Sequence, residues 1–168
     1  MTLRTEGMIR PANTADIPAL LEIWNPIICD TSITFTDQKK SPEDLARMLT
    51  AKAGMGQPFL VAETKEGLAG FATYGAFRSG PGYTHIAEET ILLSDWAWGR
   101  GIGRQLIGTL ADHARDAKIG SLIAGISGEN LPAIAFHKAV GFVERGRIPR
   151  AGWKFGRWID LVLMQMPL

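Results

Sequence analysis

Apolar residues recur along this chain with two different periods, and these predict alternating helices and strands. Spacings of three and four predict four helices, at 15–29, from Ser41 past Leu49, at 102–118 and at 130–140. Short apolar or alternating runs predict seven strands, at 8–10, 59–63, 68–77, 83–93, 121–127, 142–148 and 158–166. This order is typical of a mixed α/β domain with three layers, in which helices cover a central sheet.

Local signals mark the ends of several elements. Ser41 is followed by proline and two acids, a strong helix start because the serine caps the helix and the acids lie near its positive end. Thr14 is expected to cap the first helix, and Gly141 is expected to end the last. Short turns join the strands between 59 and 93, so we expect an antiparallel meander there. The helix at 102–118 is expected to bury Ile102, Leu106, Ile107, Leu110, Ala111 and Ala114.

Composition narrows the class of protein. The chain has 168 residues, of which 46% are apolar and 21% charged, as in one ordinary globular domain, with 1–7 as an extension before the first strand. The net charge of +1 argues against a nucleic-acid partner. No apolar run approaches the roughly 18 residues of a membrane span, and the N-terminus is too polar for a signal peptide. A cytoplasmic location without a membrane partner is therefore expected.

Cysteine and histidine are too few and too scattered for metal or disulfide chemistry. Cys29 is the one cysteine, so the chain forms no internal disulfide, and its apolar neighbours favour a role in the core. Three histidines lie far apart in the sequence, and with a single cysteine they predict no metal site.

A glycine-rich run carries the strongest chemical signal. Gly99, Gly101 and Gly103 alternate with other residues, and Arg100 and Arg104 add positive charge. The run joins a strand to the N-terminus of a helix, where backbone N–H groups can surround a phosphate or pyrophosphate. A plain loop is the alternative interpretation. The spacing and the late position differ from the dinucleotide-binding fingerprint, and the P-loop motif is absent.

In this context the run resembles the acyl-CoA motif of the GNAT N-acetyltransferases. The stretch Trp98-Gly-Arg-Gly-Ile-Gly-Arg stands at the motif position, with Trp98 where the family has Gln or Arg. The resemblance covers nearly the whole chain and implies the GNAT fold, a mainly antiparallel sheet and acetyl-CoA as co-substrate. It implies that Asn130 contacts the pantetheine, although Asn130 can also cap a helix. The other implied cofactor-binding residues are Ile91, Leu92, Leu93, Gly99, Arg100, Gly101, Ile102, Gly103 and Arg104.

Further motifs resemble the phosphinothricin and methionine sulfoximine acetyltransferase branch. They include Tyr83-x4-Glu88-x-Thr90, Phe136-His137-x3-Gly141-Phe142 and Gly152-x-Lys154-Phe155-Gly156-Arg157-Trp158. The resemblance implies a small amino-acid-like acceptor, direct transfer in a ternary complex and a homodimer. Other acceptors, namely an ordinary L-amino acid, a polyamine or a protein N-terminus, remain open, as does a CoA-binding sensor without catalysis.

Two side chains are candidates for proton transfer. An α-amine with a pKa near 8 is only about a tenth neutral at pH 7, so a carboxylate that takes its proton speeds amide formation. Glu88 matches the family's base by position. His137 follows Asn130 by seven residues, on nearly the same helix face, where many members have a tyrosine that protonates the leaving thiolate. The resemblance assigns this role to His137, and a packed or surface histidine is the alternative.

Strand alternation separates the acids of the 83–93 strand. It puts Glu88 and Thr90 on one face and Glu89 on the other, where Glu89 is a solvated acid or a supporting residue. An arginine is expected to meet the acceptor's carboxylate, and Arg78 fits this role unless it is a solvated turn charge. Lys154 and Arg157 are further candidates, and Phe35 is a candidate pocket wall. The substrate-binding residues implied are Arg78, Ser79, Gly80, Glu88, Glu89 and Thr90.

Overall fold

The computed structural model describes residues 7–168, so most of the extension expected at 1–7 lies outside the described residues. Seven strands form one sheet in the order β1-β2-β3-β4-β5-β7-β6. The strands are β1 (Met8–Pro11), β2 (Phe59–Thr64), β3 (Gly67–Ala76), β4 (Ile86–Leu93), β5 (Ser121–Ser127), β6 (Val143–Lys154) and β7 (Arg157–Pro167). The helices are α1 (Ile17–Asp30), α2 (Pro42–Gly54), α3 (Ile102–Asp116) and α4 (Leu131–Val140). The predicted order of elements is therefore confirmed.

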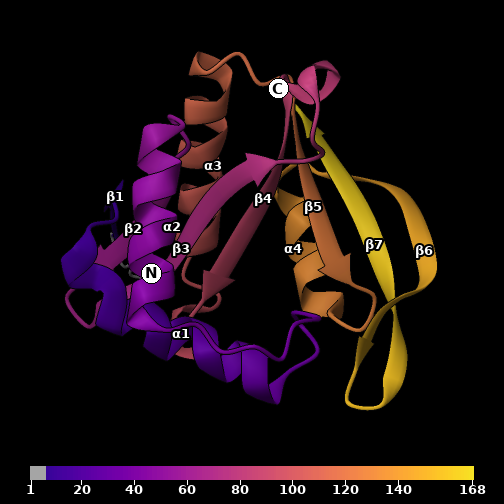
Figure 1. Cartoon of the computed structure of the whole chain (residues 1–168), viewed down its shortest axis with the longest axis horizontal. Helices are drawn as coiled ribbons and strands as arrows, with labels where there is room; N and C mark the ends of the chain where they lie inside the picture. The colour runs from indigo at the N-terminus through magenta and orange to yellow at the C-terminus, as the bar shows by residue number, and fades with distance from the viewer. Residues whose placement is uncertain (1–6) are drawn as a thin grey trace, which may run out of the picture.

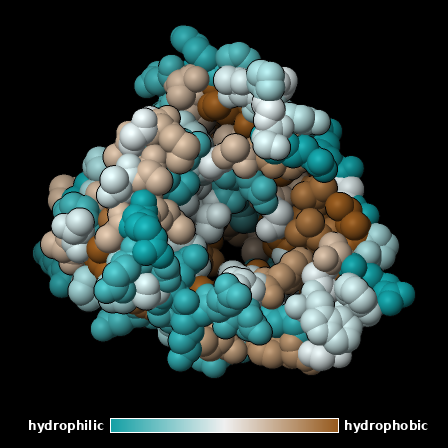
Figure 2. Space-filling view, in the orientation of Figure 1, coloured by the Kyte–Doolittle hydropathy of each residue, from teal (hydrophilic) through white to brown (hydrophobic). Residues whose placement is uncertain are grey.

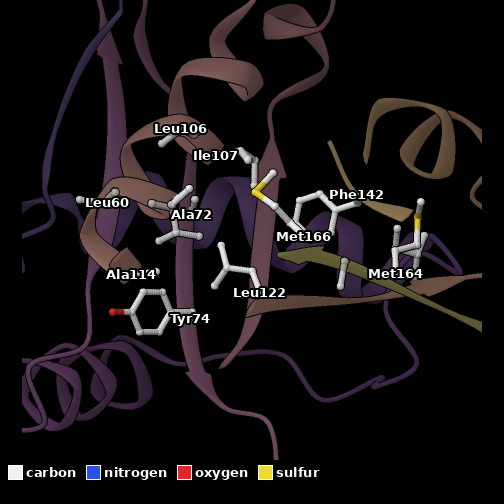
Figure 3. Packing of buried hydrophobic residues seen from close by; sticks show 14 of the residues in the cluster. Leu60, Ala72, Tyr74, Leu106, Ile107, Ala114, Leu122, Phe142, Met164 and Met166 are labelled. Atoms are coloured by element: carbon white, nitrogen blue, oxygen red, sulfur yellow. The ribbon is translucent and has the colours of Figure 1, made fainter. Parts of the chain in front are cut away.

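Helices cover both faces of the sheet, which confirms the three-layer architecture (Figure 1). On one face α1 and α2 enclose a core in which Trp24 packs on Phe71 with ring centroids 4.6 Å apart. On the other face α3 and α4 enclose a larger core that includes Leu106, Leu122 and Met166 (Figure 3). Burying these apolar faces is the main driving force that holds the layers together. All six α3 residues expected to be buried are in this core, namely Ile102, Leu106, Ile107, Leu110, Ala111 and Ala114.

The sheet is antiparallel except between β4 and β5, which run parallel. These two strands pair only from Ile86↔Ser121 to Glu88↔Ile123, although β4 continues to Leu93 and β5 to Ser127. Figure 1 shows the two strands diverging beyond this point. The backbone of residues 89–93 therefore has a sheet partner on its β3 side and none on its β5 side, which opens a gap in the middle of the sheet.

Gly70 allows the close approach of β3 to the end of β4. A Cβ at Gly70 would overlap the carbonyl oxygen of Leu92 and the side chain of Leu93. Glycine is needed here for space, because no larger residue fits without moving the last residues of β4. The position of the β4 edge beside the gap thus depends on a residue in the neighbouring strand.

Several element ends shift by one or two residues from the sequence-based expectation, and three differences are structurally informative. Asn13, and not Thr14, caps the first turn, a 3-10 turn at Thr14–Asp16, because its side chain accepts a hydrogen bond from Ala15 N. The strand predicted from Tyr83 begins at Ile86, since Pro81–Tyr83 forms a 3-10 turn. The strand predicted to end near 148 continues to Lys154 through an irregularity between Ile148 and Gly152. No helix within residues 7–168 combines the length and the apolar character that a membrane crossing requires.

Gly70→Ala is expected to lower the free energy of unfolding by about 1–3 kcal/mol, since the added methyl group overlaps β4. Gly75→Ala is a matched control on the same strand, where the nearest atom to an added Cβ is Lys52 Nζ at 3.6 Å. This control is expected to change the free energy of unfolding by less than about 0.5 kcal/mol. Urea unfolding of both variants measures the difference, and equal losses would refute the close-approach argument.

Candidate functional site

Two cavities meet where β4 and β5 diverge, and Figure 2 shows this face of the molecule hollowed near its middle. The first, which we call the cofactor cavity, has a volume of about 420 Å³ and runs between the glycine loop and α4. Its lining is mainly apolar and includes Ile91, Leu92, Leu93, Trp98, Gly99, Gly101, Gly103, Arg104, Asn130, Phe136 and His137. Most of the side chains and glycines predicted to bind the cofactor therefore come together in one place.

The glycines of the loop serve two different purposes. Gly99 and Gly101 have φ angles of 74° and 81°, in the left-handed region that favours glycine. Gly103 lies inside α3, and a Cβ there would come within 3.0 Å of the Phe136 ring on α4. The first turn of α3 consequently starts beside the cavity with its N–H groups free of helical partners, which suits an anionic group.

Two predicted cofactor residues have their side chains elsewhere. Arg100 forms a 2.7 Å ion pair with Glu66, and its guanidinium lies over the Trp96 ring. Ile102 is fully buried in the core between the sheet and α3. Neither side chain lines the cofactor cavity, so any contribution from these residues is limited to the backbone of the loop.

The second cavity, which we call the acceptor cavity, lies across the gap and has a volume of about 390 Å³. Glu88, Glu89 and Thr90 line it from β4, together with residues that the sequence analysis did not assign. These additional residues include Ile33, Thr34, Gly125, Ser127, Ala151 and Leu161, while Phe35 had been considered as a wall. Ile91, Leu92, Asn130 and His137 line both cavities, so the two cavities share a wall.

Glu88 presents its carboxylate to this acceptor cavity over β5. A Cβ at Gly125 would lie 3.1 Å from Glu88 Oε1, so glycine leaves the room that the carboxylate occupies. Glu88 is accessible to solvent, but partial burial raises the pKa of its carboxyl group, and the charge of Glu89 raises it further. A raised pKa makes this carboxylate a better proton acceptor near neutral pH.

Glu89 lies on the other face of β4, as strand alternation predicted, but it is buried and not solvated. Its Oε1 is 2.7 Å from Nε2 of His137, and the two side chains are 3% and 5% exposed. Glu89 Oε2 is buried and has no hydrogen-bond partner among residues 7–168. The expectation of a solvated acid was therefore wrong, because α4 places an imidazole over this strand.

His137 uses both ring nitrogens inside the protein. Nδ1 donates to the carbonyl oxygen of Ala133 at 2.7 Å, one turn earlier in α4, and Nε2 meets Glu89. The rings of Phe136 and Phe142 contact the imidazole at their edges. Burial disfavours the charged form of His137 and by itself lowers its pKa. The hydrogen bond to Glu89 and the charge of its carboxylate favour the charged form, and the net effect is a raised pKa of His137.

Asn130 has the capping role that the sequence allowed. Its Oδ1 accepts a hydrogen bond from Ala133 N at 3.2 Å, at the start of α4, and the residue also lines both cavities. The structure thus leaves room for both roles considered for Asn130. Among residues 7–168, no three His, Cys, Asp or Glu side chains are grouped so as to hold a metal ion.

The predicted substrate loop is not part of either cavity. Arg78, Ser79 and Gly80 are exposed after β3, and the Arg78 guanidinium lies over the Phe77 ring. Arg157 pairs with Glu129 at 2.8 Å. The arginine expected to face an acceptor carboxylate is therefore not brought to the cavity by this chain's own fold.

Lys154 is buried and has a structural role. Its Nζ donates to the carbonyl oxygens of Ile28 and Thr34, at 2.6 and 2.7 Å. It thereby ties β6 to the end of α1 and to the loop that contributes Phe35 to the acceptor cavity. Gly152 on the same strand allows this arrangement, because a Cβ there would overlap the Phe35 ring. No local sequence signal reveals contacts between residues so far apart in the chain.

Comparison with known proteins identifies relatives over nearly the whole length. Residues 9–163 match the model of the acetyltransferase (GNAT) domain family. The chain is 35% identical over 160 residues to the L-amino acid N-acyltransferase MnaT of Escherichia coli, covering 95% of this chain and 93% of that protein. It is 33% identical to the L-methionine sulfoximine/L-methionine sulfone acetyltransferase of Salmonella typhimurium, covering 95% and 94%.

Solved structures give the same picture. The ribosomal-protein-alanine N-acetyltransferase of Brucella melitensis superposes with a TM-score of 0.92 at 40% identity, covering 96% of this chain and 99% of that one. The yncA acetyltransferase of Salmonella typhimurium, solved with acetyl-CoA, has a TM-score of 0.92 at 32% identity, covering 97% and 94%. The names that state an acceptor differ in it, and all of these names describe transfer of an acyl group.

Proposed function

This chain belongs to the GNAT acetyltransferase family, and we propose that it acetylates the α-amine of a small amino-acid analogue such as methionine sulfoximine or methionine sulfone. The observation that carries this proposal is the junction of the two cavities at Ile91 and Leu92, on the strand whose Glu88 lines the acceptor cavity. An acyl donor in one cavity and an amine in the other would meet at this junction, beside a carboxylate suited to take a proton.

The groups that line the cofactor cavity suit the chemistry of acetyl-CoA. The start of α3 offers backbone N–H groups to the pyrophosphate, and Arg104 offers it a positive charge. The unpaired edge of residues 89–93 offers backbone groups to the pantetheine amides, in the way that an extended segment adds to a sheet. Apolar side chains of α4, including Phe136, cover the other side of this path.

The positions of the side chains support direct transfer from acetyl-CoA to the amine, without a covalent acetyl-enzyme. In the reaction an N–C bond forms between the amine and the acetyl carbonyl carbon, and the C–S bond of the thioester breaks. Glu88 takes the amine proton, directly or through water, and the thiolate leaves and takes up a proton from solvent to give coenzyme A. Cys29 lies on α1 and lines neither cavity, so a covalent acetyl-cysteine step has no support.

Glu88→Gln is expected to lower kcat at least about a hundredfold, because the amide cannot accept the amine proton. The Michaelis constant for acetyl-CoA is expected to stay within about twofold, since Glu88 lines the acceptor cavity and not the cofactor cavity. Steady-state thiol release measures both values. Glu22→Gln, on the exposed side of α1, is the matched control. Normal turnover of the Glu88 variant would remove this residue from the role of base.

The pH dependence of kcat/KM should report on the same carboxylate. Glu88 must be ionised to act as a base, so the rate should fall as the pH falls through its pKa. Burial and the charge of Glu89 raise that pKa, and the acid limb should therefore have a midpoint above the ordinary value for glutamate. A profile of Glu88→Gln that keeps the same acid limb would assign the limb to another group.

A panel of acceptors tests the proposed substrate class. Thiol release from acetyl-CoA is measured with methionine sulfoximine, methionine sulfone, phosphinothricin, methionine, spermidine and a peptide that begins with alanine. The proposal expects the highest kcat/KM for the methionine analogues. Preference for the peptide would support a protein N-terminus as acceptor, and tight CoA binding without release would support a sensor.

We also propose that the enzyme is a homodimer. Trp153, Phe155 and Trp158 on the β6–β7 hairpin are each about half exposed, and a second copy would cover them. Replacing Trp153 and Trp158 by serine is expected to shift the sedimentation coefficient from that of a dimer to that of a monomer. Met55→Ser changes a similarly exposed apolar residue at the C-terminal end of α2 and is the control. A monomeric wild-type protein would overturn this proposal.

A further inference from the structure

The Glu89–His137 pair is the most deeply buried ionisable contact near the two cavities. Oε1 and Nε2 are 2.7 Å apart, and neither side chain is more than 5% exposed. Burying two ionisable side chains carries a large desolvation penalty, and removing one partner leaves the other unpaired in the interior. A buried pair of this kind beside a reaction site raises the question of what it does for the reaction.

The hydrogen bonds fix where the proton lies. The carbonyl oxygen of Ala133 can only accept, so Nδ1 of His137 must carry a hydrogen. Nε2 faces a carboxylate oxygen, so a second hydrogen lies between the two side chains. With an ionised Glu89 this makes His137 an imidazolium, whose two N–H bonds are both used within the protein. His137 therefore has no hydrogen left to give to a leaving thiolate.

The charges of the Glu89–His137 pair are oriented relative to the two cavities. His137 lines both cavities, whereas Glu89 lines the acceptor cavity alone, so His137 is the member of the pair that faces the cofactor cavity. The positive end thus lies towards the bound thioester and the negative end towards the bound amine. Glu89 Oε2, buried without a partner, adds an acceptor at the negative end.

We propose that Glu89 is a positioning residue that holds His137 as a fixed cation, so that the pair forms a dipole oriented along the path of acetyl transfer. This inference rests on the proposed function. As the amine attacks, positive charge develops on its nitrogen and negative charge on the thioester oxygen and sulfur. A preorganised dipole of this orientation stabilises both charges without having to reorganise during the step.

Few other charged groups face the pair. Glu88 lies next to Glu89 on the opposite face of β4, and Tyr74 pairs with Glu89 across β3 and β4. The Tyr74 hydroxyl forms a hydrogen bond with Nδ1 of His113 on α3, with the two atoms 2.8 Å apart. Arg104 of α3 shares the cofactor cavity with His137, and its side chain donates to the carbonyl oxygen of Ala139. β5 carries no charged residue. Burial of Glu89 and His137 thus leaves each as the other's main electrostatic partner.

Glu89→Gln tests the proposal with little change in shape. The glutamine amide can donate to a neutral Nε2, which keeps the contact and removes the dipole. We expect kcat to fall about tenfold to a hundredfold, with the Michaelis constant for acetyl-CoA within about twofold. Tyr74→Phe removes another buried hydrogen bond nearby, outside both cavities, and is the control for general destabilisation. It should leave kcat unchanged.

A double-mutant cycle with His137→Gln separates this role from a merely structural one. If Glu89 acts through His137, Glu89→Gln should cost nothing more in a His137→Gln background, because the dipole is already absent. Independent costs, or a Glu89→Gln enzyme with wild-type kcat between about pH 6 and pH 9, would overturn the proposal.

The protonation of His137 gives a readout that does not depend on activity. Nitrogen-15 NMR of the imidazole should show both nitrogens protonated in the wild type from about pH 6 to pH 8, and one deprotonated in Glu89→Gln. A neutral His137 in the wild type overturns the inference even if the enzyme is active. A protonated His137 in a protein that acetylates nothing in the panel would instead refute the proposed function and keep the pairing.

Discussion

The parting of β4 from β5 is the constraint on which the rest of the site depends. These strands are the sheet's one parallel pair, because the chain leaves the end of β4, returns along α3 and enters β5 in the same direction. Their pairing stops at Glu88, and the backbone groups of residues 89–93 that face β5 must find other partners, since buried backbone groups are rarely left unpaired. A gap of this kind would close unless side chains held it open.

The side chains that border the gap also carry the chemistry. Glu88 lies on one face of β4 and Glu89 on the other, so the same strand presents a proton acceptor to the acceptor cavity and an anchor to α4. The Glu89–His137 contact joins α4 to β4 beyond the point where β5 stops pairing with β4. Gly125 complements this arrangement, because the missing side chain on β5 is the space that the Glu88 carboxylate occupies. Strand divergence, the ion pair and the base are thus parts of one packing arrangement.

The sequence predicted what depends on near neighbours in the chain. The capping box of Ser41 with Asp44, the buried face of α3 and the glycine loop all follow from residues a few positions apart. What it missed depends on contacts between distant segments. From the sequence alone Glu89 is interpreted as a surface acid. In the structure it is covered by His137 of α4, which lies 48 positions later in the chain. The loop that contributes Phe35 to the acceptor cavity is tied down by Lys154, 120 positions from Thr34, and no periodicity encodes that bond.

The same contacts bear on how an acceptor is recognised. Among residues 7–168, the ionisable groups that line the acceptor cavity are Glu88, Glu89 and His137, and His137 has no free N–H. Lys154, which lies nearby, is occupied by two carbonyl oxygens, and burial lowers its pKa. Within residues 7–168, backbone N–H groups are therefore the remaining partners for the carboxylate of an amino-acid acceptor, and in the proposed dimer another copy of the chain could supply a positive charge. In the proposed dimer, a second copy seated on the exposed β6–β7 hairpin would lie close to the wall formed by Ala151 and would link acceptor specificity to oligomeric state through that strand.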